Sequence, residues 1–171
     1  MTEFRLDFCK NCLGEPFCRC LKNGLSKPSF AHLKDYGLII PSSPAAADTI
    51  ERFLRDYEAT PTDFDAIYTG DLGKIGSRLL YELLLKKGID IESVHKDCGV
   101  LIYGTEDVDV HAGGSGCGCC ASVLCGHILN RMLKRKEKNI LFIATGALLS
   151  PTTTLQGESI PSIAHLVNIR I

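Results

Sequence analysis

The 171-residue chain has no tryptophan, no long run of basic residues and a formal net charge of only −1. Proteins that bind nucleic acid usually carry a basic patch with interleaved aromatic side chains, so nothing in the composition indicates a nucleic-acid partner. No apolar run reaches the about 18 residues that span a bilayer, and residues 1–9 lack the apolar core of a signal peptide. We therefore expect a cytoplasmic protein.

Internal repeats and low-complexity tracts are also missing, and 45% hydrophobic residues suffice for one domain with a core. Cysteine, by contrast, is abundant, and nine cysteines in a chain without a signal sequence argue against a disulfide framework. One alternative is a small zinc knuckle, although structural zinc sites usually separate two cysteine pairs by a longer loop. The other is an unstructured or poorly packed leader, and we expect no metal and no cofactor. The cysteines concerned are Cys9, Cys12, Cys18 and Cys20.

Regular patterning begins near residue 44 and divides the chain into an irregular leader, 1–43, and a regular part, 44–171. Ser43 and Pro44 are typical of an N-cap and a first helical position. Amphipathic helices and apolar strands then alternate, which predicts an α/β fold. We expect helices over 44–57, 75–84 (ending by Gly88) and 121–132, and strands over 66–69, 98–103, 140–145 and 164–171, the last broken at His165.

A glycine-rich loop, residues 111–118, leads directly into the third expected helix. Glycine lets a backbone approach a ligand closely, and the free N–H groups at a helix start suit an anion. The loop is therefore a candidate binding site, and the alternative is a tight packing turn. Its members are His111, Gly113, Gly114, Ser115, Gly116, Cys117 and Gly118.

Asp71 directly follows an expected strand, where ligands of α/β sheets gather. It is either a site residue or a turn aspartate that caps the helix beginning near Lys74.

Cys117, Cys119 and Cys120 lie at a helix start, where a thiol pKa can fall, so they are either reactive thiols or small packed side chains. Three histidines lie nearest the candidate loops, and each is either catalytic or structural. They are His111, His127 and His165. No Ser-His-Asp arrangement can be assigned.

Several motifs in order resemble the C-terminal half of the stage V sporulation protein AD family of spore-forming bacteria, over about residues 44–168. The motifs are PAAADTI at 44–50, TGDL at 69–72, DCG at 97–99, AGGSGC at 112–117, ATGALLSP at 144–151, GESIP at 157–161, and Ala164 with His165. The resemblance implies one thiolase-like half, with a mixed sheet of about five strands and helices on its faces. It also implies a ligand-binding protein that helps to move pyridine-2,6-dicarboxylic acid (dipicolinate) into the developing spore.

The chain also departs from that family. Only the second half is recognisable, and the half that holds the position of the thiolase nucleophilic cysteine is missing, as in a truncated reading frame. Where thiolases carry a catalytic histidine, this chain has Gly118–Ala121, which contains no histidine. Where they carry a later catalytic cysteine, it has Thr145–Ala147, which contains no cysteine. The resemblance therefore implies binding without catalysis. The alternatives are an acyltransferase that uses a loop cysteine, and a fragment without a ligand.

From the loops and the resemblance together, the expected ligand-binding residues are Asp71, His111, Gly113, Gly114, Ser115, Gly116, Cys117, Gly118 and His165. The expected partners are dipicolinic acid, other proteins of the spore uptake assembly, and either a second copy or the missing N-terminal half. Such an assembly would place the protein peripherally at the forespore inner membrane.

Overall fold

The computed structural model describes residues 5–8 (backbone only), 42–103, 117–147, 152, 156 and 161–171. Its helices are α2 (Ser42–Asp56), η3 (Pro61–Asp63), α3 (Gly73–Leu85), α4 (Cys98–Tyr103), α5 (Cys119–Val123), the π turn η4 (Leu124–Ile128) and α6 (Leu129–Leu133). Its strands are β1 (Arg5–Phe8), β2 (Ala66–Thr69), β3 (His95–Asp97), β4 (Asn139–Ala147) and β5 (Ser162–Arg170). We call the continuous helical run 119–133 the crossover helix. None of the helices in the described ranges is long and apolar enough to cross a bilayer.

The strands form one mixed sheet in the order β1-β5-β4-β2-β3, which confirms the predicted α/β class. β3, β2 and β4 are parallel, whereas β5 is antiparallel to β4 and β1 is antiparallel to β5. Residues 44–171 supply four of these strands, one fewer than expected for that part of the chain. The fifth, β1, comes from the leader, where no pattern predicts a strand.

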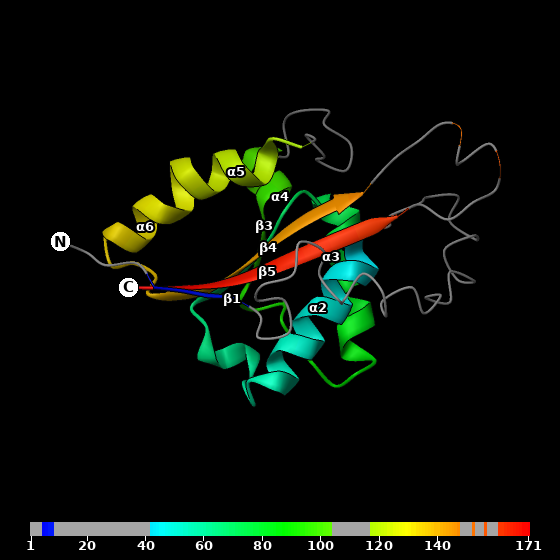
Figure 1. The fold of residues 1–171 in the computed structure, drawn as a ribbon, viewed down its shortest axis with the longest axis horizontal. Coiled ribbons are helices and arrows are strands. Elements are labelled where there is room, and N and C mark those ends of the chain that lie inside the picture. The colour runs from blue at the N-terminus through cyan, green and yellow to red at the C-terminus, as the bar shows by residue number, and fades with distance from the viewer. Residues whose placement is uncertain (1–4, 9–41, 104–116, 148–151, 153–155, 157–160) are drawn as a thin grey trace.

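Helices cover both faces of the sheet (Figure 1). On one face, α2 and α3 bury a cluster that includes Ile50, Leu80 and Leu141. On the other face, the crossover helix buries Ile128 and Met132 against the sheet. Continuous apolar strands such as β4 are typical of a sheet that is covered on both sides.

The expected strand over 98–103 is wrong, because this segment is the helix α4 and the strand lies just before it, at β3. A six-residue apolar run has no periodicity that separates a buried strand from a helix. One long-range and one local hydrogen bond favour the helix: the Cys98 amide donates to the Gly70 carbonyl, and the Val100 amide donates to the Asp97 side chain three residues before it.

Two smaller expectations also change. Ser43 lies inside α2 rather than before it, and its buried hydroxyl donates to the Gly76 carbonyl at 2.9 Å, which links α2 to α3. β5 runs unbroken through His165, which pairs with Ala144 of β4. The predicted stop at Gly88 is confirmed, since this glycine follows α3 with a positive φ of 76°.

Candidate functional site

The parallel strands β2, β3 and β4 end at one edge of the sheet, which we call the carboxyl edge and define by Thr69, Gly70, Asp71, Asp97 and Thr145. The chain passes from β2 to β3 through α3 on one face, and from β3 to β4 through the crossover helix on the other (Figure 1). Ligands of α/β sheets bind outside the carboxyl ends of the strands where such connections diverge. The topology therefore makes this edge the candidate site.

Gly70 brings β2 and β4 into close contact at the carboxyl edge. Its amide donates to the Ile143 carbonyl at 2.8 Å. A Cβ on Gly70 would lie 2.8 Å from the Thr145 nitrogen, closer than real Cβ atoms approach. Any side chain at this position would push the two strand ends apart, so packing alone accounts for this glycine.

The buried carboxylate of Asp97 organises the backbone around the edge. It accepts hydrogen bonds from the Thr69 hydroxyl at 2.7 Å and from the amides of Leu72 and Gly73, each at 2.9 Å. A fourth donor, the Val100 amide, lies 3.1 Å away. Burial raises the pKa of Asp97, and these donors act in the opposite direction. Asp97 therefore binds the first amides of α3, a capping role that one reading of the sequence gave to Asp71.

His95 extends this network from β3 to α3. The Thr69 hydroxyl donates to Asp97, so it accepts from His95 Nε2, which lies 2.8 Å away. Nε2 therefore carries the ring proton, and Nδ1 accepts from the Tyr81 hydroxyl at 2.7 Å. A neutral ring satisfies both bonds, and burial lowers the pKa of His95 to about 4. The result is a directed chain of hydrogen bonds from Tyr81 through His95 and Thr69 to Asp97.

Four of the predicted site residues lie in described parts of the structure. Asp71 is partly buried at the carboxyl edge, and Cys117 and Gly118 are exposed just before α5. His165 is exposed on β5 and pairs with Ala144, which packs against the crossover-helix cluster, so both lie on that face of the sheet. The remaining predicted residues, His111, Gly113, Gly114, Ser115 and Gly116, fall outside the described residues.

Gly118 bears on the choice between a binding loop and a packing turn. Its φ is −87°, and a Cβ added here would have no neighbour within 4 Å. Among the described residues, therefore, neither backbone strain nor packing requires a glycine at this position. That observation favours a role in which something outside the described residues approaches the backbone.

The thiols near the edge differ in exposure. Cys98 and Cys119 are buried in one core cluster, Cys120 is partly buried, and Cys117 and Cys125 are exposed. Burial raises the pKa of the Cys98 thiol far above its usual range, with the nearby Asp97 carboxylate adding to the shift. Cys98 is consequently an unreactive core thiol. No three His, Cys, Asp or Glu side chains gather to hold a metal in the part of the chain that the structure describes, which leaves out the four N-terminal cysteines.

A second polar cluster, absent from the sequence predictions, lies on the crossover-helix face. The buried Glu137 carboxylate accepts from Tyr68 at 2.9 Å, from Lys96 at 2.7 Å and from Arg131 Nη2 at 2.9 Å. Burial raises the pKa of Glu137, but these donors more than offset it, so the pKa lies below its usual value. The cluster ties the end of the crossover helix to β2 and β3. Sequence spacing gives little sign of it, because Tyr68 and Lys96 lie far from Arg131 and Glu137 in the chain.

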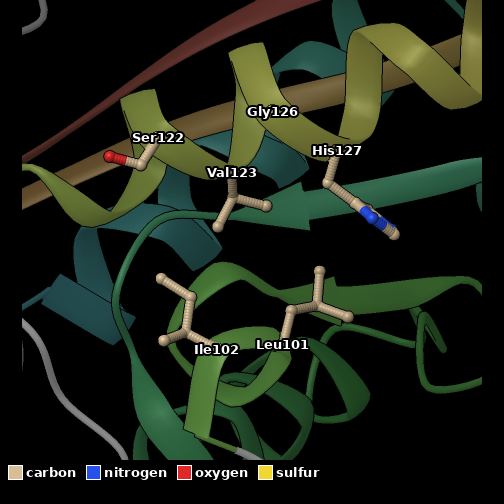
Figure 2. A pocket seen from close by; sticks show the side chains of 6 residues that line it. All are labelled: Leu101, Ile102, Ser122, Val123, Gly126 and His127. Carbon is tan, nitrogen blue, oxygen red and sulfur yellow. The ribbon is translucent and has the colours of Figure 1, made fainter.

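A groove lies between α4 and the crossover helix (Figure 2). Leu101 and Ile102 project from α4 toward the helix, and Val123 and His127 project toward α4 (Figure 2). Ser122 and Gly126 complete its lining. His127, one of the three histidines singled out in the sequence, therefore faces this groove, whose lining contains none of the carboxyl-edge residues.

Comparison with known proteins adds two findings. The family model described as stage V sporulation protein AD matches residues 32–170, so the similarity begins upstream of Pro44. The protein named stage V sporulation protein AD of Bacillus subtilis (strain 168) is 47% identical over 123 residues, which is 72% of this chain. The aligned part is 36% of that relative's length, so the chain corresponds to about a third of it.

Proposed function

Because the chain belongs to the stage V sporulation protein AD family, we propose that it binds dipicolinate at the carboxyl edge without chemical turnover. Binding there would support uptake of this dianion into the developing spore, together with other proteins of an uptake assembly at the forespore inner membrane. The family match over residues 32–170 carries the proposal. The geometry of the edge supports it in three ways.

The first support is the contrast between two helix starts at the same edge. At α3, the amides of Leu72 and Gly73 already donate to the Asp97 carboxylate. At α5, the preceding residue is Gly118, which has no side chain to cap the helix. The first amides of a helix have no carbonyl acceptor in a preceding turn, and they attract anions. A ligand carboxylate would therefore bind at the start of α5 and in the glycine-rich loop.

The second support is the placement of His165, whereas the charge of Asp71 argues against direct contact with the ligand. Asp71 carries the same sign of charge as dipicolinate, so we place it at the border of the site rather than against a ligand carboxylate. His165 lies on the face of the sheet that the crossover helix covers, near the strand ends. Its ring could donate a hydrogen bond to a carboxylate.

The third support concerns catalysis. Cys98 and Cys119 are buried, and the Cys98 thiol is held in its protonated, non-nucleophilic form. The exposed Cys117 keeps the acyltransferase alternative testable. Incubation with an acyl-CoA followed by intact-mass measurement should show no covalent adduct. An adduct on Cys117, Cys119 or Cys120 would favour the enzyme over the binding protein.

The experiment on binding is calorimetric titration with dipicolinate. In Gly118→Val, the added side chain has open space and a tolerable φ, so the variant should fold yet block backbone approach by the ligand. We expect the affinity to fall by about ten- to a hundred-fold. Gly114→Val, which adds bulk to the glycine-rich loop, should also weaken binding. Cys120→Ser, whose thiol has no role in binding, should bind like the wild type. Normal binding by folded Gly118→Val and Gly114→Val would refute the site, and no binding by the wild type would favour the fragment alternative.

A further inference from the structure

The crossover helix ends in a cluster of cations, which we call the basic tip. α6 ends at Leu133, and the turn that follows leads into β4 at Asn139. Because β2, β3 and β4 are parallel, this end of the sheet is opposite to the carboxyl edge, and Figure 1 shows α6 at the end where β4 begins. Lys138 is left out of the tip, since the exposed Asp65 carboxylate accepts a hydrogen bond from its amide. The basic tip consists of Arg131, Lys134, Arg135 and Lys136, with Leu133 among them.

Acidic side chains do not neutralise the basic tip. The one acid between residues 131 and 138 is Glu137, which is 3% exposed and already paired with Arg131. Within the described ranges, no acid forms an ion pair with Lys134, Arg135 or Lys136. Positive charge is therefore concentrated at this end of a chain whose formal net charge is −1.

Arg135 occupies a position where the fold itself favours glycine. The Lys136 amide donates to the Arg131 carbonyl at 3.0 Å and the Arg135 amide donates to the Met132 carbonyl at 2.8 Å, which are the two hydrogen bonds of a Schellman motif. Arg135 is its left-handed residue, with a φ of 57°, where glycine is usual because it has no Cβ to strain the backbone. The dipole of a helix favours cations at this end, but Arg131 and Lys134 already supply them without strain. Local structure therefore does not explain the arginine, and its side chain points to a role outside the fold.

Leu133 places an apolar side chain among these charges. It is 50% exposed, whereas Ile128 and Met132 of the same helix are fully buried. Cations around an exposed apolar side chain are typical of segments that lie at the interface of an anionic bilayer. Nucleic-acid sites combine cations with aromatic side chains on which bases stack, and residues 129–139 contain no aromatic residue. The composition therefore favours a lipid surface over nucleic acid.

We infer that the basic tip binds the anionic surface of a lipid bilayer, with its cations against the phosphate groups and Leu133 in the interface. Each Lys or Arg near such a surface strengthens binding, and the apolar side chain adds a second kind of contact. This is contact with lipid itself, whereas an uptake assembly requires only contact with other proteins. The carboxyl edge then faces away from the bilayer, so the inference is independent of dipicolinate binding.

Co-sedimentation of the full chain with lipid vesicles tests the inference. The wild type should bind vesicles of equimolar phosphatidylglycerol and phosphatidylcholine but not vesicles of phosphatidylcholine alone, and added salt should weaken the binding. Replacing Lys134, Arg135 and Lys136 together with glutamine should lower the partition coefficient by about a hundred-fold, or about fivefold for each cation. Equal binding to both kinds of vesicle, binding to neither, or an unchanged partition coefficient in the triple variant would overturn the inference.

Arg135→Gly separates a role in lipid binding from a role in the fold. Glycine suits the left-handed position, so the melting temperature should stay the same or rise. The partition coefficient should nevertheless fall by about fivefold, because one cation is lost. Arg135→Lys keeps the charge and should bind vesicles like the wild type. A lower melting temperature with unchanged vesicle binding in Arg135→Gly would show that Arg135 serves the fold and would overturn its part in the inference.

Matched controls exclude a general effect of charge. Replacing Lys74, Arg78 and Lys86 together with glutamine removes as many exposed cations from α3 and its end, and should change the partition coefficient by less than about twofold. Gly118→Val should bind vesicles like the wild type, which keeps this test separate from that of dipicolinate binding.

Leu133→Ser distinguishes a bilayer from a soluble polyanion. This variant should lower the partition coefficient of vesicle binding by about fivefold, because only a bilayer offers an apolar layer for the side chain. A single-stranded oligonucleotide serves as the comparison. If the oligonucleotide binds as tightly as the anionic vesicles and Leu133→Ser leaves both affinities unchanged, the basic tip serves a soluble polyanion and the inference is overturned.

Discussion

Asp97 and Glu137 are both only 3% exposed, and they lie on opposite faces of the same sheet. Glu137 is surrounded by Lys96, Arg131 and the Tyr68 hydroxyl, and its pKa is lowered. Asp97 accepts only from neutral groups, a hydroxyl and backbone amides, and its pKa is raised. The exposed fractions are the same but the pKa shifts are opposite. Desolvation raises the pKa of both groups, and only at Glu137 do the partners, two of them cationic, outweigh it.

The two carboxylates also hold different parts of the molecule. Asp97 binds backbone, and it fixes the turn after β2 and the start of α4 beside the candidate site. Glu137 binds side chains, and it fixes the end of the crossover helix. Lys96 and Arg131 remain 36% and 33% exposed, so they can turn toward water if Glu137 is removed. The backbone amides that Asp97 binds are fixed by the chain and cannot turn toward water in this way.

The largest expected effect therefore separates these two residues. Asp97→Ala leaves the amides of Leu72, Gly73 and Val100 without their acceptor and should lower the free energy of unfolding by about 4 kcal/mol. Glu137→Ala should cost about 2 kcal/mol, because its cationic partners Lys96 and Arg131 can turn toward water and only the buried Tyr68 hydroxyl loses its acceptor. Urea unfolding followed by circular dichroism measures both values. Equal losses, or a larger loss at Glu137, would contradict the comparison.

The second effect is acid sensitivity on the Asp97 face. Unfolded His95 takes up a proton below its ordinary pKa of 6.5, whereas folded His95 does so only near 4. The neutral His95 therefore makes its full contribution to the free energy of unfolding above pH 6.5. This contribution declines as the pH falls toward 4, by about 3 kcal/mol in all. Free energies of unfolding measured between pH 7 and pH 4.5 should show this decline.

Glu137 and Asp97 titrate differently in the same experiment. The lowered pKa of Glu137 contributes stability that is lost only below its ordinary value of 4.5. The raised pKa of Asp97 acts in the opposite direction, because the folded state then binds a proton more readily as the pH falls. The decline above pH 4.5 should therefore disappear in His95→Gln, and its persistence in that variant would exclude His95 as the source.

How far the sequence predicts this fold depends on the length of each signal. β4 and α3 are predicted because long apolar runs and a 3.6-residue period define them. α4 is missed because six apolar residues fit either a strand or a helix, and contacts with Gly70 and Asp97 decide between them. β1 is missed because its pairing with β5 is a tertiary feature.

The site is predicted in the same uneven way. The glycine-rich loop and Asp71 stand out as local patterns. The network around His95 is missed because it joins residues from β2, α3 and β3. One signal was present: His95 and Asp97 are two residues apart beside an apolar segment, so in a strand both face the same side. Pairing with β2 then places Thr69 opposite Asp97.

The smallest expected effect lies at the far end of the hydrogen-bond chain. Tyr81→Phe removes the donor to His95 Nδ1 but keeps a ring for the edge-to-face contact, whose centroids are 5.2 Å apart. The loss should be about 1 kcal/mol in the free energy of unfolding, well below that of Asp97→Ala, because Tyr81 is only partly buried and water can replace its hydroxyl.

The tautomer assignment also predicts how the same substitution changes the pKa of His95. With Nδ1 open to water, the ring can be protonated more easily, so the pKa of His95 should rise. NMR titration of the His95 ring in both proteins measures this shift. A pKa that falls instead would place the ring proton on Nδ1, because the charged ring would then lose an acceptor, and an unchanged pKa would contradict the assigned hydrogen bond.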